Sequence, residues 1–124
     1  MSNDFNWISF KTITNGWQAE LLLKPEHPAF IGHFPNQAIF PGVSQIELAL
    51  NVLSFGLQMP LFITEVPYAK FKAAISPNTI IQIQVNVQAK NLASWLITGS
   101  QPMFSSGQLK YAEKRLAAPA TDRL

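Results

Sequence analysis

The sequence contains no cysteine among its 124 residues. This absence excludes disulfide bonds, thiolate nucleophiles and cysteine-based metal sites. Charged residues are also scarce, at 13%, which is about half their share in an average soluble domain. Hydrophobic residues make up 48%, far more than a disordered chain contains. The chain is therefore expected to fold as one domain, and its low charge predicts that further surface is buried in an oligomer.

Signals for export and for a membrane are missing as well. The first residues lack the basic start and the apolar core of a signal peptide. The uncharged stretch 48–64 is too short and too interrupted to supply the ~20 apolar residues of a membrane span, and is interpreted as a buried helix followed by a loop. We therefore expect a cytoplasmic protein without a membrane contact.

The few charges, with a net value of +2, are unevenly distributed. Residues 70–124 hold seven of the nine basic residues, and residues 1–69 hold five of the seven acidic ones. This asymmetry indicates either an acidic partner or a solvated face with a basic tail. Nucleic acid is not an expected partner, because the sequence has no dense basic cluster and no nucleic-acid-binding motif.

Alternating hydrophobic residues predict an antiparallel sheet. Residues 5–14 and 17–23 flank Asn15-Gly16, a dipeptide that favours the type I′ turn of a tight hairpin. Pro67 is expected to mark an edge or a bulge, because proline cannot donate a hydrogen bond to a neighbouring strand. The further strands are expected at residues 61–75, 79–89, 94–98 and 107–112.

One helix is predicted between these groups of strands, over residues 42–55. Pro41 precedes its first turn, and Gly56 suits its C-terminal cap. The helix is apolar nearly all round, which is typical of a helix in the middle of a domain. The sequence thus predicts an α+β domain over residues 1–112, with a sheet wrapped around one helix, and a loose tail over residues 113–124.

The polar residues of this helix form one narrow stripe. Ser44, Glu47, Asn51 and Ser54 are spaced by three, four and three positions. A carboxylate on an apolar helix is costly unless it is paired or protonated, and burial would raise the pKa of Glu47, as suits a proton donor at neutral pH. The alternative is a structural glutamate that is hydrogen-bonded to Ser44 or Asn51.

Two histidines precede the helix. His33 lies just before it in a Gly-His-Phe-Pro segment, where it is either a proton carrier near pH 7 or structural. His27 is expected to be structural, in a surface turn. Two histidines six residues apart are poor support for a metal site, and none is expected. At the helix start, the free N–H groups of Gly42 and Val43 could polarise a carbonyl, although a plain Pro-Gly helix start is also common.

A longer pattern joins these residues. Residues 27–35 read His-Pro-Ala-Phe-Ile-Gly-His-Phe-Pro, residues 39–43 read Ile-Phe-Pro-Gly-Val, and Glu47 follows His33 by fourteen positions. The pattern and its spacing resemble the hot-dog-fold 3-hydroxyacyl-ACP dehydratases, which act on acyl groups carried by acyl carrier protein (ACP). Glu rather than Asp at position 47 is similar to the dehydratase-only branch.

The sequence also departs from the pattern of that family. Asn36 and Asn51 stand where the family has Gly and Gln. The short chain and Gln45 look more like the dehydratases of aryl-polyene or other specialised lipid pathways. These departures leave the chemistry of the resemblance intact and concern the branch and the substrate.

The resemblance implies a hot-dog fold and assigns roles to residues. His33 takes the place of the catalytic histidine, Glu47 that of the catalytic acid, and the Gly42 N–H that of the group that binds the thioester carbonyl. Val43, Phe34 and Asn51 are the further expected substrate contacts. No cofactor is implied, since the substrate arrives on the phosphopantetheine of ACP in fatty-acid or polyene-type biosynthesis.

The resemblance also implies partners. It predicts a homodimer or a higher homo-oligomer in which two sheets join edge to edge, with His33 of one chain facing Glu47 of the other. Lys70 and Lys72, in the segment Ala-Lys-Phe-Lys, match a basic pair of the family and are expected to dock ACP or its arm. The alternative is that both lysines only solvate an edge strand and discourage aggregation.

Two functions from other classes share this fold. The chain could be an acyl-binding module without catalysis, or an acyl thioesterase, and the fold alone does not choose between them. The presence of both His33 and Glu47 at the family spacing favours the dehydratase, because a binding module has no need of a carboxylate on an apolar helix.

Overall fold

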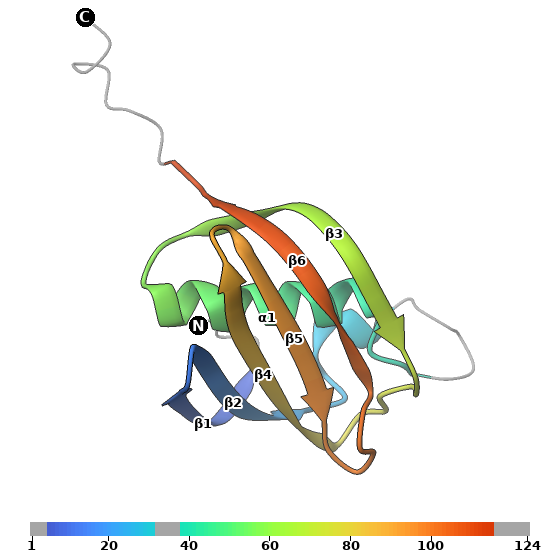
Figure 1. Cartoon of the computed structure of the whole chain (residues 1–124). Helices are drawn as coiled ribbons and strands as arrows, with labels where there is room; N and C mark the ends of the chain where they lie inside the picture. The colour runs from blue at the N-terminus through green and yellow to red at the C-terminus, as the bar shows by residue number, and fades with distance from the viewer. Residues whose placement is uncertain (1–4, 32–37, 116–124) are drawn as a thin grey trace, which may run out of the picture.

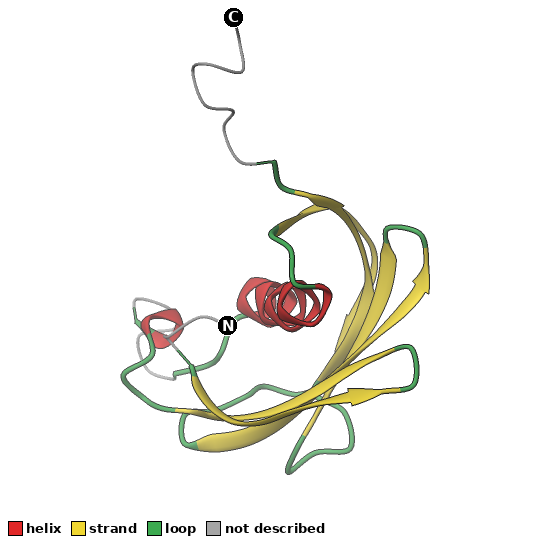
Figure 2. Ribbon diagram, turned by 90° about the vertical axis from the view of Figure 1, so that its left-hand side faces the viewer, coloured by secondary structure: helices red, strands yellow, loops and turns green. Residues whose placement is uncertain are grey.

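The computed structural model describes residues 5–31 and 38–115. Its strands form one six-stranded antiparallel sheet with the order β1-β2-β4-β5-β6-β3. This sheet curves around one long helix, α1 (Gly42–Leu57), which lies along its concave face (Figure 1, Figure 2). The predicted α+β architecture, a sheet wrapped around a central helix, is confirmed.

The elements follow the predicted order along the chain. Besides α1, they are β1 (Asn6–Ile13), β2 (Gly16–Leu23), the 3-10 helix η1 (Pro28–Phe30), β3 (Leu61–Phe71), β4 (Thr79–Ala89), β5 (Leu92–Thr98) and β6 (Ser105–Glu113). Since β6 ends at Glu113, the sheet extends one residue past the predicted domain end. The predicted loose tail lies, from residue 116 on, outside the described residues.

The hairpin of β1 and β2 forms where the Asn-Gly dipeptide predicted it. Asn15 has φ 58°, the left-handed conformation that the turn requires and that asparagine tolerates. Gly16 has a second reason to be glycine, since a Cβ there would overlap the Val85 carbonyl of β4. The dipeptide therefore serves both the turn and the close approach of the next strand.

The C-terminus of α1 differs from the prediction. The helix continues through Gly56 to Leu57, and the capping residue is Gln58, whose φ of 57° is left-handed. Its N–H donates to the carbonyl oxygens of Phe55 and Ser54, which satisfies carbonyls at the helix end. Gly56 is instead required by packing, because a Cβ there would overlap the indole of Trp17. The prediction that Gly56 caps the helix was wrong.

The long strand β3 lies at one edge of the sheet. Its pairing with β6 shifts register between Ile63 and Glu65 and again between Glu65 and Tyr68, and Pro67 lies within the second irregularity, as predicted. The strand ends at Phe71, earlier than expected, because the chain then turns inward and the Ile75 carbonyl accepts a hydrogen bond from the Phe40 N–H at 2.8 Å. This bond ties the segment after β3 to the segment before α1.

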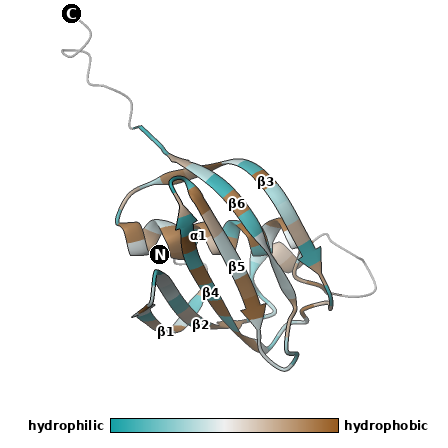
Figure 3. Ribbon diagram, viewed as in Figure 1, coloured by the Kyte–Doolittle hydropathy of each residue, from teal (hydrophilic) through white to brown (hydrophobic). Residues whose placement is uncertain are grey.

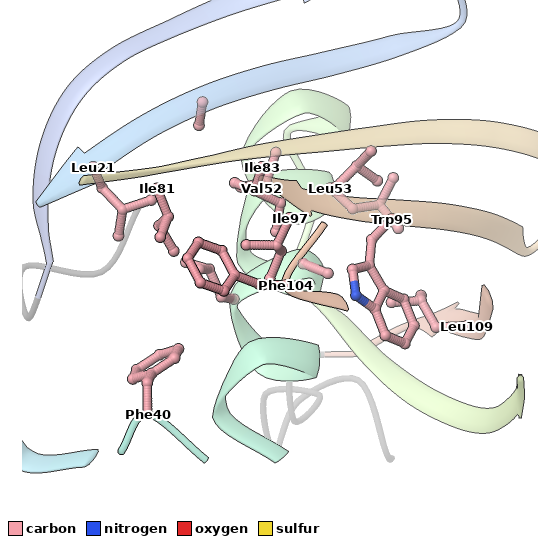
Figure 4. Packing of buried hydrophobic residues seen from close by; sticks show 14 of the residues in the cluster. Leu21, Phe40, Val52, Leu53, Ile81, Ile83, Trp95, Ile97, Phe104 and Leu109 are labelled. Carbon is pink, nitrogen blue, oxygen red and sulfur yellow. The ribbon is translucent and has the colours of Figure 1, made fainter. Parts of the chain in front are cut away.

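The hydrophobic core lies between α1 and the concave face of the sheet. Figure 3 shows the apolar residues concentrated on the helix and the inner strands, and Figure 4 shows the side chains of both layers in contact. Each leucine or isoleucine buried there contributes about 1.5–3 kcal/mol relative to an exposed one. The fully buried members include Leu21, Leu48, Val52, Leu53, Ile81, Ile83, Ile97 and Leu109. No helix within the described residues is long and apolar enough to cross a membrane.

Candidate active site

The residues expected at the site are only partly described. His33 and Phe34 fall within residues 32–37, which lie outside the described residues. The structure places the other expected residues on or beside two elements. Gly42, Val43, Glu47 and Asn51 belong to α1, Lys70 lies near the end of β3, and Lys72 follows the end of that strand.

Hydrogen bonds on both the N–H and the carbonyl of Phe40 hold the start of α1 in place. Phe40 is fully buried and is bonded to Ile75 through its N–H, while its carbonyl accepts a hydrogen bond from Gln45 Nε2 at 3.3 Å. Pro41 is the N-cap and has no side-chain oxygen with which to cap the first turn. The first helical hydrogen bond runs from the Gln45 N–H to the Pro41 carbonyl at 3.1 Å. The positive end of the helix dipole is therefore available to a ligand at Gly42.

A cavity of about 460 Å³ opens over this helix start. Phe40, Gly42 and Gln45 line it from the start of α1, and Phe71 and Lys72 line it from the end of β3 and the residue that follows. In Figure 1 the end of β3 lies at the same end of the molecule as the start of α1. A largely apolar cavity lined by the first residue of a helix suits a ligand with an apolar body and a polarisable carbonyl.

The polar stripe of α1 lines a second hollow, of about 330 Å³. Ser44, Glu47 and Asn51 line it together with Phe5 and His27, which confirms that these helix positions share one face. Ser54, the fourth member of the stripe, instead donates to the Met59 carbonyl at 2.5 Å.

The burial expected for Glu47 is not observed. Its side chain is exposed in the single chain, because the core face of α1 begins at Gln45 and the stripe points away from the sheet. Within the described residues, Glu47 forms no hydrogen bond with Ser44 or Asn51, so the structural alternative does not hold either. A role of Glu47 as a proton donor is therefore implied by the resemblance alone.

His27 is a structural residue of the second hollow. Its Nδ1 accepts a hydrogen bond from the Ala29 N–H at 3.0 Å and so caps η1. Its ring stacks on Phe5, with centroids 4.4 Å apart and planes 21° apart. This agrees with the structural role predicted for His27 in a surface turn, since its N–H donates to the Lys24 carbonyl at 3.1 Å and residues 24–26 are exposed. Its own ring is half-buried. The Phe5 contact could not be predicted, because Phe5 is distant from His27 in the sequence.

The two lysines differ in position. Lys72 lines the cavity at the helix start, and its N–H donates to the Phe104 carbonyl at 2.9 Å, beyond the end of β3. Lys70 lies within β3 opposite Ser106. Both residues are exposed. The position of Lys72 favours a role at the cavity, and that of Lys70 fits the solvation of an edge strand.

Gln45 belongs to the site but was not among the expected ligand contacts. It is 3% exposed and lines the cavity with Gly42, which precedes it by three positions. This spacing is the signal that could have found it, because residues three apart on a helix are neighbours on one face.

Comparisons with known proteins agree with this description. A family model described as ApeI dehydratase, of the ApeI-like type, matches residues 10–108. The dehydratase heterocomplex ApeI:P from Xenorhabdus doucetiae superposes with a TM-score of 0.80 at 23% identity, over 91% of this chain and 100% of that chain. No curated protein matches the sequence.

Two further structures resemble the chain. An uncharacterized protein from Erwinia carotovora subsp. atroseptica has a TM-score of 0.72 at 22% identity, over 88% of this chain and 96% of the other. The fluoroacetyl-CoA thioesterase FlK has a TM-score of 0.61 at 13% identity, over 82% of this chain and 88% of the other. At these identities the likeness shows the fold, which is the hot-dog fold.

Proposed function

The chain belongs to the ApeI-like dehydratase family, and on that basis we propose that it removes water from a 3-hydroxyacyl thioester carried by ACP, to give the trans-2-enoyl thioester. The observation that carries the proposal is the family match over residues 10–108, a range that contains both His33 and Glu47. The start of α1, open to a cavity of about 460 Å³, supports it.

The proposed reaction begins at the thioester carbonyl. The Gly42 N–H donates to the carbonyl oxygen and stabilises the negative charge that develops there. This makes the proton on the neighbouring carbon more acidic, and His33 removes it. Glu47 protonates the hydroxyl group, the C–O bond breaks, and water leaves as the C=C bond forms. Val43, Phe34 and Asn51 contact the substrate around these groups.

We further propose that two chains complete each site. Edge strand β3 carries four exposed large apolar side chains, Phe62, Val66, Tyr68 and Phe71. An exposed apolar edge is prone to pair with a second strand. Joining two sheets at this edge would cover apolar surface, and His33 of one chain would face Glu47 of the other. A hetero-partner is the alternative, since the ApeI neighbour is described as a heterocomplex.

Light scattering of the purified chain tests the assembly. A mass of at least two chains at micromolar concentration is expected. Val66→Lys should reduce both mass and activity, whereas Gln101→Lys, an exposed control in the loop between β5 and β6, should reduce neither. A monomer with full activity would contradict the shared site, and activity that appears only after a second protein is added would favour the hetero-partner.

We place the reaction in the cytoplasm, within fatty-acid or polyene-type biosynthesis. ACP is acidic, and the basic half of this chain carries the lysine that lines the cavity. Electrostatic complementarity of this kind raises association rates. The carrier would therefore approach the cavity mouth at Lys72.

Incubation with synthetic thioesters tests the function. The substrates are 3-hydroxyacyl thioesters of several chain lengths, aliphatic and aryl-polyene, each on ACP and on coenzyme A. An enoyl product with faster turnover on ACP is expected. Release of the free acid would identify a thioesterase, the activity of the similar structure FlK. Binding without a chemical change would identify an acyl-binding module, and His33→Ala serves as the control for background reaction.

A further inference from the structure

Gln45 places a polar side chain on the core face of α1. Its neighbours on that face are apolar and buried, namely Leu48, Ala49, Val52 and Leu53. Ser105, the other buried polar residue within the described chain, accepts a hydrogen bond from the Trp95 indole at 3.1 Å. Gln45 Oε1, in contrast, is buried and has no hydrogen-bond partner among the described residues. A buried acceptor without a donor is unfavourable, which points to a donor supplied by a ligand.

The orientation of the Gln45 amide follows from its surroundings. Nε2 donates to the Phe40 carbonyl at 3.3 Å, and that carbonyl oxygen, an acceptor, could not bond to Oε1. Phe40 is itself held by its bond to Ile75. Oε1 is therefore the amide atom without a hydrogen-bond partner among the described residues. The side chain that carries it lines the cavity of about 460 Å³.

We propose that Gln45 Oε1 accepts a hydrogen bond from the amide N–H of the pantetheine arm that lies nearest the thioester sulfur. The inference rests on the proposed function. Gly42 and Gln45 both line the cavity and are neighbours on one helix face. In a pantetheine thioester, a sulfur and two methylenes separate the carbonyl carbon from this amide nitrogen. A thioester bound at the Gly42 N–H thus brings its amide N–H within reach of Gln45.

The charge at the cavity favours the arm over the acyl chain as its occupant. Lys72 lines the same cavity, and an ammonium group attracts the phosphate at the far end of the arm. The one donor of a 3-hydroxyacyl chain, its hydroxyl group, faces Glu47 in the proposed reaction, and the rest of an aliphatic chain has no donor for Gln45 Oε1. Because ACP and coenzyme A present the same arm, Gln45 recognises a group common to both.

A single-atom change in the substrate tests the inference. The 3-hydroxyacyl thioester of N-acetylcysteamine carries the amide N–H, and the thioester of 2-mercaptoethyl acetate has an ester oxygen in its place. Each is measured as a substrate, by kcat/KM, and as a competitive inhibitor of the ACP-linked reaction. The wild-type protein should prefer the amide by roughly 10-fold, since the ester leaves the buried acceptor unpaired.

Two variants of Gln45 separate a ligand contact from a structural role. Gln45→Met removes the acceptor and should reduce the preference for the amide to about 1-fold. Gln45→Glu keeps an acceptor oxygen and should retain most of the preference. If Gln45 only held Phe40 in place, each variant would turn over both thioesters more slowly by the same factor. The preference for the amide over the ester would then be unchanged. Because the readout is a ratio, partial unfolding of a variant does not alter it.

The outcomes distinguish this inference from the function on which it rests. Dehydration of both thioesters at equal efficiency by the wild type would overturn the role of Gln45 and leave the dehydratase intact. An amide preference that persists in Gln45→Met would assign the contact to another group. If the wild type dehydrates no 3-hydroxyacyl thioester on any carrier, the proposed function fails and this inference fails with it.

Discussion

The ring of Phe71 lies directly against Gly42, so closely that a Cβ on Gly42 would lie 2.9 Å from Phe71 Cζ. Phe71 is the last residue of edge strand β3, and Gly42 is the first residue of α1. Both residues line the cavity, so the contact joins the two elements that form it. The glycine is therefore needed for this close approach.

Replacing Gly42 with alanine should lower activity more than stability. The methyl group would displace the Phe71 ring, which is 48% exposed in the single chain, so we expect a change of less than about 1 kcal/mol in the free energy of unfolding. The shift at the carbonyl-binding N–H should reduce kcat/KM by roughly 10- to 100-fold. Thermal unfolding and steady-state kinetics measure the two effects.

A second substitution provides the control for this prediction. In Gly42→Ala with Phe71→Leu, the smaller side chain leaves room for the methyl group, and part of the lost activity should return. The two residues are in contact, so their effects should not be additive. If Gly42→Ala alone keeps full activity, the helix start is not the site of carbonyl binding.

The catalytic pair is tested by removing each member. His33→Ala and Glu47→Gln should each reduce turnover by a factor of roughly 10²–10⁴, the usual effect of losing a positioned acid or base. Ser44→Ala, on the same polar stripe, is the matched control and should retain activity. Near-normal turnover in either variant, with folding intact by circular dichroism, would show that the pair is wrongly assigned.

Local signals in the sequence predicted local structure well. Asn15-Gly16 specifies its turn through the left-handed backbone that Asn15 adopts, and the strand predicted over residues 79–89 has the same bounds as β4. The bulge at Pro67 follows from a missing N–H. Each of these features depends on a residue and its immediate neighbours.

Contacts between distant residues could not be predicted in the same way. Gly56 was expected to cap α1 because glycine often does so, but the reason for this glycine is Trp17, 39 positions away in the sequence. Glu47 was expected to be buried because the helix is apolar nearly all round. Only the sheet shows which helix face is covered, and that face includes Gln45 and not Glu47.

The packing of Gly56 predicts an unusual effect on stability. In an exposed helix interior, replacing glycine with alanine stabilises by about 1 kcal/mol. Here Gly56→Ala should destabilise by about 1–3 kcal/mol, because the added Cβ overlaps the Trp17 indole. Chemical unfolding measures the difference. Gly56→Ala combined with Trp17→Leu should be less destabilised than the sum of the single changes, and a stabilised Gly56→Ala would show that the contact is absent.

The different positions of the two lysines predict unequal effects on carrier binding. Lys72 lines the cavity, whereas Lys70 lies within the exposed edge strand. Lys72→Glu should therefore raise KM for the ACP-linked substrate more than Lys70→Glu does, and most clearly at low salt, because charges near an interface act mainly on the association rate. A small N-acetylcysteamine thioester has no phosphate and no carrier protein. Its KM should therefore rise less in these variants than the KM of the ACP-linked substrate. Steady-state kinetics at two salt concentrations measures KM for each variant and each substrate.

An equal rise in KM for both substrates would indicate damage to the site itself. An unchanged KM in both variants would support the view that these lysines only solvate the edge of the sheet.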